Sequence, residues 1–281
     1  MKRSILNIIN SLFIYGSVCI VCIFLITIIV QIFSYGLPVI NWEFIVGYPR
    51  NGMTKGGIFP AIVGTVLLTM ITTIVSVPFG IACAIYLSEY AKDNGLTRLI
   101  RASIRNLAGI PSIIYGLFGL AFFVQALQMG TSMLASGCIL GLLSLPYIIT
   151  TTEEALRRVP VLVREGSLAL GATQLESIRD VVLPAALPGI LTGVILSLSR
   201  AAVETAPILF TGAVFYINSL PGSPTQEFMA LPYHLYMLST QHQSIEQVRP
   251  LAYGTAKILI ILVFLLNIVA FYIRFKKRIY E

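Results

Sequence analysis

The sequence predicts an all-α membrane protein with six transmembrane helices, and three observations lead to that prediction. Hydrophobic residues make up 57% of the 281 residues and charged residues only 11%, which leaves too little polar surface to cover a soluble globule of this size. Six apolar stretches are each long enough to cross the hydrocarbon core, roughly 30 Å thick, as a helix. The basic residues gather in alternate loops between those stretches.

The predicted spans follow one another with short connections, apart from two outer loops and one inner loop. They cover about residues 11–35, 59–88, 107–128, 132–152, 188–213 and 252–273. The first span follows Met1-Lys2-Arg3, but its apolar run is too long for a signal peptide and no small-residue cleavage site follows, so we expect it to be retained. The third span begins at Gly109-Ile110-Pro111, where a proline near the first helical turn removes no hydrogen bond.

The loops indicate how the chain is divided. The first outer loop carries a turn signal at Asn51-Gly52. The second, about residues 214–251, contains the segment MALPYHLYML, whose Leu, Tyr and Met spacing predicts a short helix. We therefore expect an N-terminal helix with its outer loop at 1–58, a transmembrane core at 59–274 that includes an inner loop at 153–187, and a tail at 275–281.

The distribution of basic residues predicts the orientation of the chain. The net charge is +7, and most of the Lys and Arg residues lie in the termini and in two loops: Lys2, Arg3, Lys92, Arg98, Arg101, Arg105, Arg157, Arg158, Arg164, Arg179, Arg274, Lys276, Lys277 and Arg278. The other loops hold only Arg50, Lys55 and Arg249. Because positive loops stay on the cytoplasmic side, we expect a multi-pass protein of the cell membrane with both termini in the cytoplasm, and no nucleic-acid surface.

Few residues of this chain suit catalysis or metal binding. The four cysteines all lie in predicted spans, and the C-x-x-C at Cys19 and Cys22 has no second ligand pair, so we interpret them as buried hydrophobic residues. No histidine lies within a predicted span, which argues against an intramembrane enzyme. The chain also has no G-x-x-x-x-G-K-[ST] phosphate loop, so we expect neither metal nor cofactor in it.

The inner loop at 153–187 is unusually long for a cytoplasmic connection. Its apolar residues recur at near-helical spacing among charges, at Leu162, Leu168, Ala169, Ala172 and Leu175. We predict a helix, a turn at Gly171, and a second helix that ends at Leu183-Pro184. The spacing alone fits burial of one side against a partner protein or, equally, against lipid headgroups.

Arg200 and Glu204 lie within the fifth predicted span, where isolated charges are costly. If that span begins near Pro188, a rise of about 1.5 Å per residue puts Arg200 roughly 18 Å into the membrane. A central charge costs about 2.5 to 3.5 kcal/mol, so this face must point into the protein or a wet cavity. The two charges could simply neutralise each other. Forked guanidinium donors also suit a tetrahedral oxyanion, and we interpret Arg200, Glu204, Thr205 and Ser199 as part of an anion path.

Several segments resemble one family of transporters. Glu165-Gly166-Ser167, Gly171 and Leu183-Pro184 have the spacing of the EAA loop of type I ABC-importer permeases, although the family usually opens that loop with Glu-Ala-Ala. The stretch from Ser199 to Pro207 looks like the fifth-helix signature of phosphate-importer permeases. Segments 109–119 and 231–236 are similar to others of the same subfamily, so the resemblance covers about residues 59–274 and fits the PstA-type subunit best.

The resemblance implies the type I ABC importer permease fold and a non-catalytic permease subunit of an inorganic phosphate importer. In that family the EAA loop couples the permease to an ATPase, which here assigns coupling to Glu165, Gly166, Leu168, Ala169, Leu170, Gly171 and Ala172. The implied partners are a PstC-type permease, a dimeric PstB-type ATPase that binds ATP and Mg, and a PstS-type phosphate-binding protein outside the inner membrane.

Two alternatives remain open from the residues. An importer for sulfate, molybdate or phosphonate would present the same charges, because one arginine does not distinguish these oxyanions. A stand-alone channel or secondary carrier would lack a reason for the coupling loop.

Overall fold

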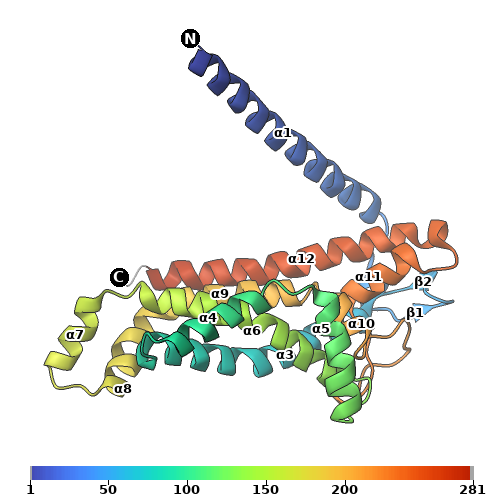
Figure 1. The fold of residues 1–281 in the computed structure, drawn as a ribbon. Helices are drawn as coiled ribbons and strands as arrows, with labels where there is room; N and C mark the ends of the chain where they lie inside the picture. The colour runs from blue at the N-terminus through green and yellow to red at the C-terminus, as the bar shows by residue number, and fades with distance from the viewer. Residues whose placement is uncertain (1, 279–281) are drawn as a thin grey trace.

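The computed structural model describes residues 2–278 and is built mainly from helices, which confirms the predicted all-α class (Figure 1). Its elements, in chain order, are α1 (Lys2–Gly36), α2 (Trp42–Val46), β1 (Pro49–Arg50), β2 (Lys55–Gly56), α3 (Phe59–Ile85), the π-helical turn η1 (Tyr86–Tyr90), α4 (Gly95–Leu107), α5 (Ser112–Gly119), η2 (Leu120–Ala126), α6 (Met133–Arg157), α7 (Val161–Ala169), α8 (Gln174–Ser177), η3 (Ile178–Val182), α9 (Leu183–Ala201), α10 (Ala206–Leu209), α11 (Leu231–Thr240) and α12 (Ile245–Arg278).

Five helices in the described part of the chain are long and apolar enough to cross a membrane. They cover Asn10–Gly36, Phe59–Tyr90, Met133–Arg157, Gln174–Ala201 and Ile245–Val269. The first, second, fourth and sixth predicted spans are therefore confirmed, with shifts at their ends. The predicted tail at 275–281 begins inside α12, which runs to Arg278, and residues 279–281 lie outside the described residues.

The third predicted span is wrong as a single straight helix. The chain forms two helical segments, Gly95–Leu107 and Ser112–Ala126, which meet at 98°. Pro111 directly precedes α5 with an extended ψ of 137°, and as a proline it also lacks the amide that would continue the α4 ladder. The apolar segment alone is about 22 Å long, too short for the bilayer core, so a sixth crossing requires the broken pair.

The fifth predicted span is wrong at both ends. The helix begins at Gln174, passes through η3 and ends at Ala201. Pro184 does not end a helix as predicted: it lies in the first turn of α9, directly after a π-helical turn that shifts the hydrogen-bond pattern where a proline amide is missing. At the other end Pro207 has no amide to donate to the carbonyl of Val203, so the helix does not continue through it.

The bundle core forms where α3, α6 and α9 pack side by side. A Cβ on Gly141 of α6 would lie 2.8 Å from Val75 of α3, and one on Gly189 of α9 would lie 2.8 Å from Ala155 of α6. These glycines therefore let the helix backbones approach more closely than any larger side chain permits. Between α6 and α9, buried Ile148 and Ile190 belong to one apolar cluster.

The two ends of the bundle differ, and we name them by their elements (Figure 1). The coupling end carries α7 and α8, and the hairpin end carries β1, β2 and α11. The predicted turn at Asn51-Gly52 joins β1 to β2, with φ of 49° and 61° as a tight hairpin requires. The predicted short helix in the second outer loop is α11. Helix α1 contacts α12 at its C-terminal end, where the rings of Tyr35 and Tyr253 stack 5.4 Å apart, and the rest of α1 projects away from the bundle.

Candidate functional site

Arg200 lies in the last turn of α9, opposite Tyr147 on α6. Tyr147 stands about 21 Å along the axis from Met133 and about 15 Å from Arg157, which are the two ends of α6. Arg200 is therefore near the middle of the bundle's length rather than at either end. Glu204 follows in the turn after α9, not one helical turn further along the same helix.

The guanidinium of Arg200 is held on one side only. Its Nη1 donates a hydrogen bond of 2.6 Å to the hydroxyl of Tyr147, and its carbon lies 4.5 Å from the centre of that ring. Its Nε is 3.6 Å from Glu204 Oε1, which is an ion pair too long for a good hydrogen bond. The Arg200 side chain remains 52% exposed, against 17% for Glu204, so most of its donors are free.

The other two predicted path residues do not join this contact. Ser199 is buried while its neighbour Arg200 is exposed, so their side chains leave α9 on different faces. Within the described residues, the Ser199 hydroxyl has no hydrogen-bond partner. Thr205 is partly buried at the start of α10, where its carbonyl accepts the amide of Leu209. The structure thus brings Arg200 and Glu204 together and leaves Ser199 facing the core.

Tyr147 is a site residue that sequence reasoning missed. Its hydroxyl accepts from Arg200 and donates to the carbonyl of Ala108, 3.1 Å away, at the break between α4 and α5. The only sequence signal is a tyrosine directly after Pro146 in the run Leu145-Pro146-Tyr147, inside an otherwise apolar span. A tyrosine in such a run is interpreted as a core residue until its contact with Arg200 on α9 is known.

A groove of about 390 Å³ lies between α6 and α9 on the coupling-end side of Arg200. It is lined by Thr151, Glu154 and Ala155 from α6, by Arg158 directly after α6, and by Ala185, Ala186, Pro188, Gly189, Thr192, Gly193 and Leu196 from α9. Leu196 is one helical turn from Arg200, so the groove begins just below the guanidinium and follows α9 toward the coupling end. Small residues on α9 leave room, and hydroxyl and charged groups on α6 make one wall polar.

The first helix and the turn predicted for the inner loop are confirmed as α7 and a turn at Gly171, but the second helix does not end at Leu183-Pro184, because α8 continues through η3 into α9. Helix α7 ends at Ala169, and Gly171 has φ of +92°, a left-handed conformation that favours glycine. The Thr173 hydroxyl accepts the Glu176 amide, while the Glu176 carboxylate accepts from Thr173 in return, which closes a capping box.

The predicted coupling residues form an exposed surface at the coupling end. Glu165, Gly166, Leu168, Ala169, Leu170 and Gly171 are exposed and Ala172 is partly buried. Leu170, at the tip, is 91% exposed. No residue of α7 is buried, so its apolar side does not pack on this chain's own core. An apolar tip of this kind is typical of a surface that another protein or membrane lipid covers.

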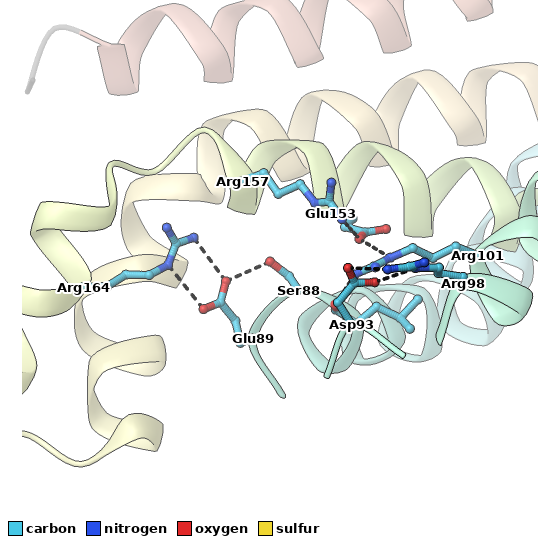
Figure 2. Close-up of polar contacts among 9 residues, drawn as sticks. Ser88, Glu89, Asp93, Arg98, Arg101, Glu153, Arg157 and Arg164 are labelled. Carbon is cyan, nitrogen blue, oxygen red and sulfur yellow. Dashed lines mark hydrogen bonds and ion pairs between the residues drawn. The ribbon is translucent and has the colours of Figure 1, made fainter. Parts of the chain in front are cut away.

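Two partly buried charges at the coupling end, Arg101 and Glu153, were also missed. Arg101 of α4 donates to Glu153 of α6 over 2.9 Å and to the carbonyl of Leu87 over 2.6 Å (Figure 2). Arg157 donates to the same Glu153 carboxylate over 2.7 Å. In the sequence, the arginines indicate only the orientation of the chain in the membrane. Their pairing with Glu153 becomes visible only in the folded chain.

Comparison with known proteins adds a family and close relatives. A family model described as binding-protein-dependent transport system inner membrane component matches residues 76–279. The chain is 35% identical over 256 residues to the "probable phosphate transport system permease protein PstA" of Methanocaldococcus jannaschii, covering 89% of this chain and 88% of that protein. It is 31% identical over 258 residues to the "probable ABC transporter permease protein YqgI" of Bacillus subtilis, covering 86% and 87%.

The arrangement of helices is also similar to a solved structure. One chain of a bacterial ABC transporter involved in the import of the acidic polysaccharide alginate superposes with a TM-score of 0.68, covering 98% of this chain and 99% of that one. The sequence identity is 13%, so this likeness concerns the fold alone. It confirms the type I ABC importer permease fold.

Proposed function

The chain belongs to the family of binding-protein-dependent transport system inner membrane components, and from this premise we propose that it is the PstA-type permease subunit of an ATP-driven inorganic phosphate importer. One observation in this chain supports an anion as the substrate. Arg200 presents free donors at mid-bundle, directly above a partly polar groove. The name of the 35% identical PstA relative supports phosphate as the anion.

The geometry of Arg200 and Glu204 suits a site that binds an anion weakly and briefly. A guanidinium holds five N–H donors, and here one is given to Tyr147 while the carboxylate of Glu204 stays at 3.6 Å. The remaining fork matches two oxygens of a tetrahedral oxyanion. Glu204 accepts from a protonated phosphate oxygen and, by its charge, keeps the site from holding the anion tightly. Conduction requires this, because an ion that binds too tightly does not leave.

Transport then depends on partners. A PstC-type permease forms the other half of the path, and a PstS-type binding protein delivers phosphate at the hairpin end. A dimeric PstB-type ATPase, which binds ATP and Mg, covers the exposed surface around Leu168 and Leu170. When it closes, the coupling segments move and the two permeases open outward. In this arrangement the chain performs no catalysis, spans the inner membrane several times and keeps both termini in the cytoplasm.

The test is uptake of labelled phosphate into vesicles that contain the assembled importer. Arg200→Gln is expected to lower uptake at least about tenfold while the complex still assembles and binds ATP, because Gln lacks the charge and the fork. Arg249→Gln is the matched control, since Arg249 is also an exposed arginine paired with a nearby carboxylate, Glu246, but lies at the hairpin end of α12. Unchanged uptake in Arg200→Gln would mean that Arg200 and Glu204 have only a structural role.

The same vesicles separate phosphate from the other oxyanions. Excess sulfate, molybdate or phosphonate should leave labelled phosphate uptake unchanged. Inhibition by one of them, with direct uptake of that anion, would instead assign the importer to that substrate.

A further inference from the structure

Arg164 connects the coupling segment to two helices of the core. It lies in the first turn of α7, and its Nη1 and Nη2 donate to the carbonyls of Val159 and Leu156, over 2.7 and 2.6 Å, at the end of α6. Its Nε and Nη2 also reach the two oxygens of Glu89, at 3.3 and 3.2 Å (Figure 2). Glu89 belongs to η1, the continuation of α3. One side chain therefore joins α7 to the ends of both α3 and α6.

Glu89 also receives the second arm of the coupling segment. Gln174, the first residue of α8, donates its side-chain amide to the Glu89 carbonyl over 2.8 Å. Between the arms, the hydroxyls of Ser167 and Ser177 lie 2.5 Å apart, which ties α7 to the end of α8. Both arms thus converge on one residue, and we call Arg164, Glu89 and Gln174 the clasp.

The ion pair of the clasp is shielded, unlike the surface that it supports. The side chain of Arg164 is 20% exposed and that of Glu89 is 9% exposed. The guanidinium also faces the carbonyl end of α6, where the helix dipole favours a cation. Because α7 has no buried residue of its own, polar bonds rather than apolar packing fix its position relative to α3 and α6. A link of this kind is directional, and the loss of the guanidinium's forked donors frees the segment to move separately.

We propose that the clasp is the mechanical link through which movement of the coupling segment reaches α3 and α6, with Arg164 and Glu89 as positioning residues for transport. This rests on the proposed function, because it assumes that an ATPase drives the segment. The helices that the clasp grips are those that line the groove or pack against it: α6 forms one wall and α3 supports α6 through Gly137 and Gly141. A movement of the clasp therefore shifts the helices that form the groove.

The experiment measures coupling in the complete importer reconstituted in vesicles, as phosphate taken up per ATP hydrolysed. Arg164→Gln should lower this ratio about tenfold or more while ATP hydrolysis continues. Arg98→Gln is the control: Arg98 also makes a two-bonded pair, to Asp93 over 3.0 and 3.0 Å, at the same end of the bundle, but that pair is exposed and joins nearby residues of one connection. A normal ratio in Arg164→Gln would overturn the proposal.

A second readout does not depend on the substrate. Spin labels at Leu162→Cys on α7 and Tyr86→Cys on η1, both exposed positions, report the distance between the coupling segment and α3 after the four native cysteines are replaced. In the otherwise native chain this distance should stay narrow and unchanged when ATP binds. In Arg164→Gln it should broaden and change with ATP, and a distance that stays narrow would overturn the clasp.

The two readouts separate the two proposals. If the native importer hydrolyses ATP but takes up no phosphate, the substrate assignment fails and the label distances still decide the clasp. If Arg164→Gln prevents assembly, Arg164→Lys, which keeps the charge but not the fork, is measured in the same way. A lysine variant with native coupling and native distances would show that the fork is not required, which also overturns the proposal.

Discussion

Two arginine–carboxylate pairs on this chain are built in opposite ways. At the coupling end, Arg164 is largely buried, meets both oxygens of Glu89 and donates to two carbonyls as well. At mid-bundle, Arg200 is half exposed, touches one oxygen of Glu204 at 3.6 Å and gives one donor to Tyr147. The first guanidinium has four of its five N–H donors occupied by the protein, whereas the second keeps most of them free.

This difference separates a link from a binding site. A largely buried arginine with four of its five donors bonded has little left to offer a ligand, and it holds the elements around it in one geometry. An arginine with free donors beside a groove is poised to exchange its contacts with an incoming anion. The same residue type in the same chain therefore serves the two halves of transport, coupling and conduction, according to how completely its donors are satisfied.

The sharpest way to break the comparison is to neutralise the carboxylate of each pair. Glu89→Gln leaves Arg164 charged and shielded without its counter-ion, which should cost about 3 kcal/mol. Because the clasp holds α7 locally, the loss should appear as roughly a hundredfold faster amide hydrogen exchange in α7 rather than as global unfolding. Glu204→Gln should cost less than about 1 kcal/mol, because its partner is half exposed.

Hydrogen exchange of both variants in the purified chain gives the answer. Exchange in α7 is compared with exchange in the last turn of α9, each against the native chain. Equal protection of α7 in Glu89→Gln and in the native chain would mean that the clasp does not stabilise α7. The pair of Arg164 and Glu89 would then not differ in strength from that of Arg200 and Glu204.

Tyr147→Phe tests the mid-bundle pair with a smaller expected effect. The variant keeps the ring beside the guanidinium and removes two hydrogen bonds, to Arg200 and to the Ala108 carbonyl, together worth about 1 to 2 kcal/mol. If Tyr147 only positions Arg200, half-maximal phosphate uptake should need a few-fold higher concentration, with the maximal rate nearly unchanged. A large fall in the maximal rate alone would instead place Tyr147 in the conformational step.

Composition and periodicity were sufficient for much of the fold. The long apolar helices α1, α3, α6 and α12 coincide with predicted spans because each contains a nearly unbroken apolar run. The third span failed as one helix because Pro111 interrupts the ladder and two tyrosines hold the bend: Tyr115 and Tyr147 donate to the carbonyls of Leu107 and Ala108 at the break. Hydropathy does not register such contacts, and it also missed the polar start of the fifth helix at Gln174.

The candidate site was predicted in part for the same reason. Arg200 and Glu204 stand out because charge is rare in an apolar run, and Gly171 because its spacing from Leu183-Pro184 is characteristic. Tyr147, Arg164 and Glu89 did not stand out, since a tyrosine in a span and charges at helix ends are common. Their roles come from pairing across 53 and 75 residues of sequence, which only the folded chain reveals.

The smallest expected effect concerns the uncharged arm of the clasp. Gln174→Ala removes one exposed hydrogen bond to the Glu89 carbonyl, a loss of about 0.5 to 1 kcal/mol. If charge dominates the clasp, α8 should exchange its amides only about two- to fivefold faster, while α7 and the ratio of uptake to ATP hydrolysis stay native. A loss of coupling as large as that of Arg164→Gln would show instead that both arms must grip Glu89 together, and that the link depends on anchoring its backbone rather than on neutralising its carboxylate.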